Sequence, residues 1–407
     1  MPTTTTTSLP ELRSEPPRAA RRVLSLLRHL RHGSLDLQTP DGEQLHFGQA
    51  TATEQPRAAI RITDWAVCDA ALKSGDVGFA ESFVAGHWTS PDLAALLELF
   101  IRNRTELEQL FYGGFWGGLL YRLRHALNRN TRQGSRKNIQ AHYDLGNEFY
   151  RLWLDPTMNY SSAWFDGAPQ ASLVDGQQAK MRRALAEAGV APGSRVLEIG
   201  CGWGAVAEVA ARDFDAQLTG VTLSHEQLAW SRERLEGAGL QADLRLQDYR
   251  DIADEPFDAV VSIEMFEAVG REYWDGYFRT VAAKLKPGGR ACIQSITIRD
   301  DLFERYVRST DFIQQYIFPG GLLPSPSEFR AHAQAAGLRV VNELAFGADY
   351  AETLHRWRET FLRHDGRVRE LGFDTRFMRL WEFYLAYCEA AFAAGNTDVM
   401  QFTLVRD

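Results

Sequence analysis

The stretch VLEIGCGWGAVAEVAARDF, residues 196–214, decides the fold of this chain. It begins with an apolar run, passes through three glycines at alternate positions and ends in an alanine-rich segment. A strand, a glycine turn and a helix in this order are typical of an α/β unit whose turn brings the backbone close to a nucleotide-like ligand. The stretch therefore predicts a strand followed by a ligand-binding turn at 198–204.

Further strand-like segments surround this unit and alternate with helix-like sequence. They lie at 195–199, 217–221, 244–247, 259–263 and 290–296, with two short terminal strands at 339–344 and 400–405. This alternation predicts a parallel, doubly wound α/β sheet over residues 139–407. Helical insertions at 302–318 and 352–395 fall between the late strands, and we expect them to form the substrate pocket.

The N-terminal third of the chain has a different pattern and predicts a small α+β domain at 18–127. A disordered tail at 1–17 should precede it, and a polar linker at 128–138 should follow it. Residues 19–32 have the periodicity of an amphipathic helix with arginines on its polar face. A β-hairpin is expected at 35–48, and Ser90-Pro91-Asp92 should begin the last helix with a capping residue and a first-turn proline.

Residues 107–127 combine aromatic side chains, four glycines and a following run of arginines. One interpretation is a surface segment with aromatics at headgroup depth and arginines near anionic lipid. The other is a helical hairpin packed between the domains, because buried aromatics are the commoner case. The arginines at 12–32 and 122–137 likewise fit either a lipid-facing surface or an ordinary solvated one.

Composition excludes several classes of protein. The net charge of −8 argues against a general nucleic-acid binder. The four cysteines are far apart and the ten histidines lack metal-ligand spacing, so neither a disulfide framework nor a metal site is expected. No apolar run reaches the about 18 residues that a membrane span needs, and the N-terminus has no secretory signal pattern. We therefore expect a cytoplasmic protein.

The glycine turn favours S-adenosylmethionine over a dinucleotide. Gly200, Gly202 and Gly204 alternate, whereas the dinucleotide motif leaves two residues before its last glycine. Glu198 lies two residues before the first glycine, and a carboxylate suits an ammonium group better than a phosphate.

Two later strand ends extend this predicted cofactor site. Asp248 and Tyr249 end the third predicted strand, where the carboxylate accepts from an adenine amino group and the ring covers the base. Thr222 ends the second strand, at a position where many such enzymes carry an acid for the ribose hydroxyls. We expect Thr222 and Gln227 to take that role as neutral partners.

Longer motifs outside the glycine turn carry a resemblance to a known family. They are KNIQAHYDLGNEFYRLWLDPTMNYSSAWF (137–165), SIEMFEAVG (262–270), QYIFPGGLLPS (315–325) and FGADYAETLHRW (346–357). Together they resemble the cyclopropane-fatty-acyl-phospholipid synthase family, which includes the mycolic acid cyclopropane synthases. The likeness extends over about residues 60–405 and is looser in the N-terminal domain.

The resemblance implies a Rossmann-like, class I S-adenosylmethionine-dependent methyltransferase domain with a lipid pocket. It implies transfer of the methyl group to a cis double bond of an unsaturated phospholipid acyl chain, which forms a cyclopropane ring. A bound bicarbonate ion then removes the proton. The implied partners are unsaturated phospholipid and the inner membrane surface, with no nucleic acid and with a homodimer as one option for assembly.

The resemblance also assigns the bicarbonate site. Glu267, Tyr350 and the backbone of Ile296 match the family's residues, whereas Ser162 stands for its cysteine and Gln294 for its histidine. Serine and glutamine keep hydrogen-bonding capacity but supply no titratable imidazole.

Other positions around this predicted site follow from the same motifs. Tyr160 and Ser161 are placed on the cofactor side, and Cys388 matches a family cysteine that we interpret as a wall residue rather than a nucleophile. Aromatic faces stabilise a cation on the acyl chain. The candidates for this role are Tyr160, Trp164, Phe266 and Tyr316. Glu264 is either a second pocket acid or a solvated one.

Three alternatives to a cyclopropane synthase stay open. A sibling fatty-acid C-methyltransferase would leave a methyl or methylene branch on the same substrate. A small-molecule methyltransferase would act on a hydroxyl or amine group. A lipid-surface binding protein with an inactive methyltransferase fold would bind lipid without chemistry, and measured S-adenosylmethionine binding separates it from the others.

Overall fold

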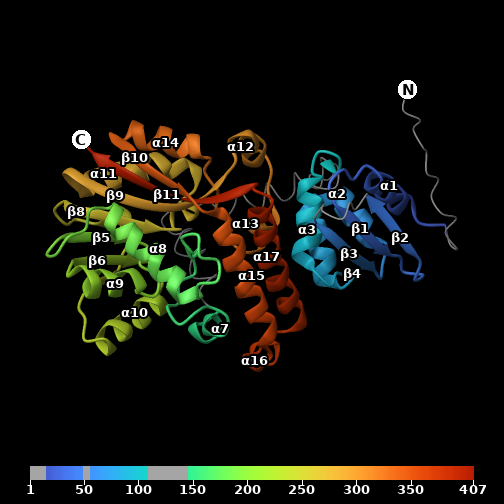
Figure 1. The fold of residues 1–407 in the computed structure, drawn as a ribbon, viewed down its shortest axis with the longest axis horizontal. Helices are drawn as coiled ribbons and strands as arrows, with labels where there is room; N and C mark the ends of the chain where they lie inside the picture. Colours follow the sequence, from blue (N-terminus) through green and yellow to red (C-terminus); the bar gives the residue numbers. More distant parts are fainter. Residues whose placement is uncertain (1–14, 49–55, 109–144) are drawn as a thin grey trace. The chain divides into compact units, whose positions relative to one another are not determined.

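The computed structural model describes residues 15–48, 56–108 and 145–407 (Figure 1). The chain divides into two compact units, Met1–Leu120 and Tyr121–Asp407. Most of the predicted tail, the aromatic segment from residue 109 onward and the linker at 128–138 lie outside the described residues. Among the described helices, none combines the length and the apolar character needed to cross a bilayer.

The first unit is built on a four-stranded sheet of order β2-β1-β3-β4. Its elements are α1 (Arg18–Leu27), β1 (Ser34–Gln38), β2 (Gln44–Gly48), β3 (Arg57–Ile62), α2 (Ala66–Ala85), β4 (Trp88–Thr89) and α3 (Leu93–Arg102). The antiparallel pairing of β1 with β2 confirms the predicted hairpin. Helix α1 buries Leu24 and Leu27 and exposes Arg18, Arg21 and Arg22, so its apolar face serves this unit's own core.

The start of α3 differs from the prediction. Asp92 is the capping residue, because its carboxylate accepts the backbone N–H of Ala95 at 3.0 Å. The Ser90 hydroxyl donates instead to the Ala59 carbonyl oxygen at 2.8 Å. Pro91 therefore precedes the cap and is not part of the first turn.

The second unit contains a seven-stranded sheet of order β10-β11-β9-β8-β5-β6-β7. Its strands are β5 (Arg195–Ile199), β6 (Gln217–Thr222), β7 (Asp243–Leu246), β8 (Phe257–Ile263), β9 (Leu285–Ile298), β10 (Leu338–Ala345) and β11 (Thr397–Arg406). Every strand falls where the sequence predicts one. The pairs among β5, β6, β7, β8 and β9 are parallel, which confirms the doubly wound α/β core.

The last two strands are longer than the short terminal strands that the sequence predicts. β11 pairs antiparallel with both β9 and β10, and it is 10 residues long. It lies between its two partners, so both of its edges are hydrogen-bonded, and its central residues Val399–Leu404 are buried.

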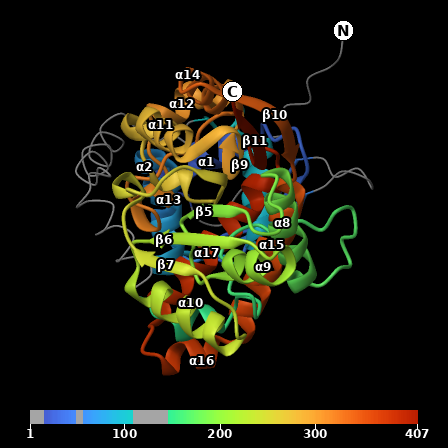
Figure 2. The ribbon, with the colours of Figure 1, turned by 90° about the vertical axis from the view of Figure 1, so that its left-hand side faces the viewer.

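Helices cover both faces of this sheet (Figure 2). They are α7 (Asn147–Arg151), α8 (Leu173–Glu187), α9 (Ala205–Phe214), α10 (His225–Gly237), α11 (Trp274–Lys284), α12 (Asp300–Val307), α13 (Phe312–Tyr316), α14 (Pro326–Ala335), α15 (Gly347–Arg363), α16 (Asp365–Glu370) and α17 (Thr375–Ala393), with short 3-10 turns at Tyr249–Asp251, Phe266–Ala268 and Arg271–Tyr273. The predicted insertions thus form α12–α13 and α15–α17.

Alternate residues of the same strands enter two separate cores. Leu197 and Val260 pack with residues of α11 and α14, whereas Val196 and Val261 pack with residues of α8, α9 and α10. This period-two division gives three layers, helix–sheet–helix. The strand order reverses next to β5, because β6 lies on one side of it and β8 on the other. Ligands of such sheets bind at the carboxyl ends of the strands at this reversal.

Candidate active site

The glycine turn follows β5 directly and has a backbone that requires glycine. Gly200 and Gly204 have φ values of +87° and +81°, in the left-handed region that side chains disfavour. A Cβ atom at Gly204 would lie 2.8 Å from the Ser231 Cβ, and one at Gly200 would lie 2.8 Å from the Met265 Cγ. The turn therefore packs against α10 and the end of β8 as closely as backbone allows, and it leads into α9.

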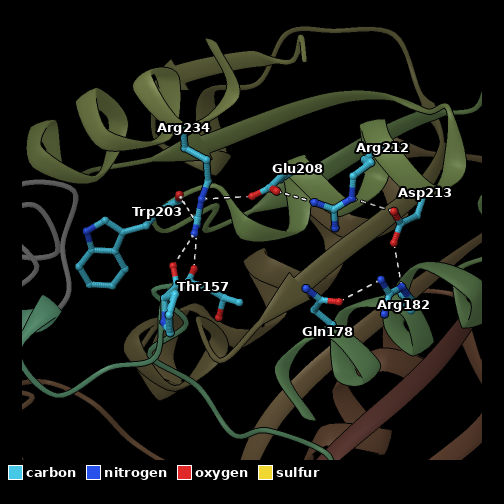
Figure 3. Close-up of polar contacts among 9 residues, drawn as sticks. Thr157, Gln178, Arg182, Trp203, Glu208, Arg212, Asp213 and Arg234 are labelled. Atoms are coloured by element: carbon cyan, nitrogen blue, oxygen red, sulfur yellow. Dashed lines mark hydrogen bonds and ion pairs between the residues drawn. The ribbon is translucent and has the colours of Figure 1, made fainter. Parts of the chain in front are cut away.

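Arg234 of α10 ties this turn to the segment that precedes α8 (Figure 3). Its guanidinium donates to the backbone carbonyls of Thr157 at 2.8 Å and Trp203 at 3.1 Å. Its Nε lies 3.2 Å from a carboxylate oxygen of Glu208. The chain of ion pairs continues from Glu208 through Arg212 and Asp213 to Arg182 of α8. Helices α8, α9 and α10 are thereby held together around the turn.

Buried charges lie next to the turn. Glu198 is 3% exposed, and its Oε2 has no hydrogen-bond partner among the described residues. Burial raises the pKa of Glu198 to about 8 and lowers that of Lys180, on α8, to about 8. The Lys180 ammonium donates to the Ser161 hydroxyl at 2.6 Å. An orphaned carboxylate oxygen beside a glycine turn suits the ammonium group of an amino-acid ligand, so these residues fit S-adenosylmethionine.

The predicted ribose partners lie together. The Thr222 hydroxyl, at the end of β6, donates to the amide oxygen of Gln227 in the first turn of α10 at 2.9 Å, and both residues are buried. Asp248, predicted to meet the adenine, forms an ion pair with Arg250. Tyr249 packs its ring edgewise on Tyr277, with centroids 5.6 Å apart. Asp248 and Tyr249 follow β7, at the same edge of the sheet as the glycine turn.

Glu264 is the centre of a polar cluster at the end of β8. Its carboxylate accepts the Ser162 backbone N–H at 2.9 Å, the Gln294 side-chain amide at 2.7 Å and the Tyr350 hydroxyl at 2.8 Å. Its φ of +48° is unusual for a residue with a side chain. Sequence reasoning left Glu264 undecided, although its place directly after a predicted strand was a signal.

A hydrogen bond from Gln401 sets the orientation of the Gln294 side-chain amide. Gln401 of β11 donates its side-chain N–H to the Gln294 Oε1 at 3.0 Å, which leaves the Gln294 Nε2 to donate to Glu264. Gln294 and Gln401 are paired residues of β9 and β11 and are fully buried. The antiparallel pairing of β11 with β9 therefore positions a donor on Glu264.

Glu267 lies in a different environment from Glu264. One of its carboxylate oxygens accepts the Ile296 backbone N–H, and the other is buried without a partner among the described residues. Burial, and next the neighbouring charge of Glu264, raise the pKa of Glu267 to about 8. The two carboxyl groups thus differ in the donors that they receive.

The residues assigned to bicarbonate do not fit that ion as arranged here. Ser162, Gln294 and Tyr350 all direct donors to the Glu264 carboxylate, and the Ile296 N–H is bound to Glu267. The Ser162 hydroxyl donates to the Ala163 carbonyl oxygen at 2.8 Å. A carboxylate of the chain already occupies the place where these donors converge. Within the part of the chain that the structure describes, no group of three His, Cys, Asp or Glu side chains is placed to hold a metal ion.

An aromatic group adjoins the polar cluster. The Tyr160 hydroxyl lies 2.6 Å from that of Tyr384, and the Tyr160 ring has centroid distances of 5.4 Å to Trp153 and 5.6 Å to Trp357. Trp357 also lies 6.2 Å from the ring of Tyr350, so the aromatic group reaches the donors of Glu264. Sequence reasoning missed Trp153, Trp357 and Tyr384, because the positions of aromatic residues along the chain do not reveal which rings pack next to the polar cluster.

The other aromatic candidates make different contacts. Phe266 is fully buried in the core, with ring contacts to Trp274 and Phe278. Tyr316 stacks on Phe312 with centroids 5.5 Å apart, and Trp164 lies beneath the guanidinium of Arg183.

Cys388 is partly buried on α17 as a free thiol. Burial raises its pKa, and so does the nearby charge of Asp311. A thiol with a raised pKa is a poor nucleophile, which agrees with its interpretation as a wall residue.

Comparison with known proteins identifies the relatives of this chain. Residues 130–402 match the family model described as mycolic acid cyclopropane synthetase. The chain is 40% identical to tuberculostearic acid methyltransferase UfaA1 of Mycobacterium tuberculosis, over 88% of this chain and 86% of that protein. It is 35% identical to cyclopropane-fatty-acyl-phospholipid synthase of Escherichia coli K12, over 86% of this chain and 88% of that protein.

Solved structures agree with these matches. Mycolic acid cyclopropane synthase CmaA1, complexed with SAH and CTAB, is similar with a TM-score of 0.62 and 32% identity, over 66% of this chain and 98% of that one. Coclaurine N-methyltransferase is similar in fold alone, with a TM-score of 0.63 and 18% identity, over 81% of this chain and 99% of that one. The predicted methyltransferase fold is therefore confirmed.

Proposed function

The chain belongs to the mycolic acid cyclopropane synthetase family, and from this premise we propose that it adds a one-carbon unit from S-adenosylmethionine to a cis double bond in an acyl chain of an unsaturated phospholipid. The product of the leading proposal is a cyclopropane ring. S-adenosylmethionine supplies an electrophilic methyl group when bound.

The glycine turn and Glu198 hold the donor in this proposal. An alkene is a weak nucleophile, so the two reacting carbons must be held in line at about 3–3.5 Å in a site without water. The rigid turn, which the contacts of Arg234 hold to the segment before α8, provides that positioning. In this proposal the acyl chain lies against the ring of Tyr160, which the buried rings of Trp153 and Trp357 hold in place.

The single observation that carries the proposal is the contact between the aromatic group and the polar cluster. Methyl transfer to an alkene leaves a positive charge on the acyl chain, and aromatic faces stabilise such a charge. A base must lie next to it to complete the reaction. Trp357 contacts both Tyr160 and Tyr350, and Tyr350 donates to Glu264, so both requirements are met by adjoining side chains.

A second product is favoured by a specific observation. Ser162 and Gln294 replace the cysteine and histidine of the resemblance, and the relative with 40% identity is named as a tuberculostearic acid methyltransferase. A methyl or methylene branch on the same substrate is therefore the second candidate. Both candidates start with the same carbon–carbon bond formation.

The test is product identification. The purified protein is incubated with vesicles of an unsaturated phosphatidylglycerol and S-adenosylmethionine carrying a ¹³C-methyl group. Proton and carbon NMR of the extracted lipid distinguish a ring from a branch, and vesicles of the saturated lipid are the control. Labelling of the saturated lipid, or label confined to headgroups, would rule out the proposal.

We also propose that the protein is cytoplasmic and binds the inner membrane surface peripherally, with a homodimer as one mode of assembly. The exposed arginines of α1 support an electrostatic contact with anionic lipid. The protein should co-sediment with anionic vesicles but not with neutral ones. This binding should be lost in about 0.5 M salt, because salt screens the attraction between exposed charges. Binding to both kinds of vesicle alike would contradict it.

A further inference from the structure

We propose that the Glu264 carboxylate is the base that removes the proton from the methylated acyl chain, so that this protein does not use a bicarbonate ion. This inference rests on the proposed function. It follows from where the donors of the site point. The family resemblance assigns Ser162, Gln294 and Tyr350 to a small carboxylate-like anion. In this chain the Ser162 backbone N–H and the side chains of Gln294 and Tyr350 donate to Glu264.

The backbone presents Glu264 to the site at a conformational cost. Its N–H donates to the Gln294 carbonyl oxygen at 2.8 Å, so the residue continues the pairing of β8 with β9. Its φ of +48° then turns the chain at the end of the strand. A side chain disfavours this conformation relative to glycine, and such strain is typically retained at functional sites.

The two neighbouring carboxyl groups differ in the donors and charges around them. Burial raises the pKa of Glu264, but the nearby Lys180 ammonium and the three donors that its carboxylate receives oppose that shift and stabilise the ionised form. Burial and then the charge of Glu264 raise the pKa of Glu267 to about 8, although the Ile296 backbone N–H and the Ser295 side chain oppose that shift. Two adjacent carboxyl groups in such contrasting environments take different roles, so Glu264 is the base and Glu267 carries the proton.

The step balances without any further reagent. The double bond attacks the methyl carbon, the carbon–sulfur bond breaks with its electron pair remaining on sulfur, and the second alkene carbon is left positive. Glu264 then forms an O–H bond with a hydrogen of the new methyl group. The electron pair of the broken C–H bond forms the second carbon–carbon bond of the ring. The proton passes from the Glu264 carboxyl group to water after the products leave.

The experiment measures the turnover of the full-length protein and of its Glu264→Gln and Glu264→Gly variants. Each is assayed in carbonate-free buffer, with and without about 20 mM added bicarbonate. Glutamine keeps the shape of the side chain and removes the base. Glycine suits the positive φ at this position and leaves room for a small anion. Glu382→Gln is the matched control, because it is a partly buried carboxylate on α17 whose charged neighbours are Arg358 and Arg379.

We expect wild-type turnover to be the same with and without bicarbonate. Glu264→Gln should lose about 10²–10⁴-fold in turnover, the usual contribution of a general base. Its dissociation constant for S-adenosylmethionine, measured by calorimetry, should stay within about twofold of wild type, which shows that it is folded. Bicarbonate should raise the turnover of Glu264→Gly by at least about tenfold, and Glu382→Gln should match wild type.

Two results would overturn the inference and leave the proposed function intact. One is wild-type turnover that rises about tenfold or more when bicarbonate is added. The other is a Glu264→Gln variant that forms product within about threefold of the wild-type rate. Failure of the wild-type protein to modify unsaturated lipid in either buffer would instead reject the proposed function, and this inference with it.

Discussion

Replacing Gly204 by alanine tests the geometry of the cofactor turn. The added Cβ would lie 2.8 Å from the Ser231 Cβ and 3.2 Å from its Cα, so the contact involves backbone as well as side chain. The Ser231 hydroxyl donates to the Gly202 carbonyl oxygen at 2.9 Å, and moving Ser231 away breaks that bond. The substitution therefore disturbs the turn at two places.

The expected loss of stability has two contributions. The φ of +81° costs alanine about 1–2 kcal/mol. The overpacked contact costs about 1–3 kcal/mol more, which gives a total of roughly 2–5 kcal/mol in the free energy of unfolding. Gly239 offers a matched control, because its φ is +68° but an added Cβ would meet nothing within 4 Å. Gly239→Ala should therefore lower the free energy of unfolding only by the cost of the positive φ, about 1–2 kcal/mol.

Urea denaturation measures the free energy of unfolding, and calorimetry measures the affinity for S-adenosylmethionine. Gly204→Ala should bind the cofactor at least about tenfold more weakly, because its turn is displaced, whereas Gly239→Ala should bind it as wild type does. Equal stability of the two variants, or wild-type cofactor affinity in Gly204→Ala, would refute the close packing of the turn on α10.

Three further predictions concern other parts of the site. Arg234→Met removes donors to the carbonyls of Thr157 and Trp203, so urea denaturation should show a loss of about 2–3 kcal/mol, and an unchanged free energy of unfolding would contradict this. Because the pKa of Glu267 is raised to about 8, the folded state binds its proton more tightly than the unfolded state does. The free energy of unfolding should therefore fall as pH rises from about 4.5 to 8, by up to about 1.4 kcal/mol per pH unit. Thermal melts of Glu267→Gln should show a shallower fall over the same range. Cys388→Ala should keep turnover within about threefold in the NMR assay, and a loss beyond about 100-fold would restore the nucleophile interpretation.

Local sequence patterns were sufficient for the secondary structure of the second unit and for the cofactor turn. Short apolar segments between stretches of helical periodicity predicted the positions of all its strands. The helical and the strand periodicity both arise from the backbone geometry of neighbouring residues, so they can be recognised in the sequence. The turn at Gly200 and Gly204 was predictable for a similar reason, since a positive φ directly after a strand is a local requirement. Motif likeness then supplied the family, which the comparisons confirm.

Only the tertiary structure decided which groups meet at the ends of the strands. Glu264, Ser162 and Tyr350 are separated by 86 residues or more in sequence, and their hydrogen bonds depend on how β8, α15 and the segment before α8 converge. The antiparallel course of β11, which places Gln401 behind Gln294, depends equally on packing. Lys180 has the sequence pattern of a solvated helical residue, yet it is buried because α8 covers the sheet. The sequence by itself determined the fold and the cofactor turn, because those depend on neighbouring residues; the identity of the base depends on contacts across the chain.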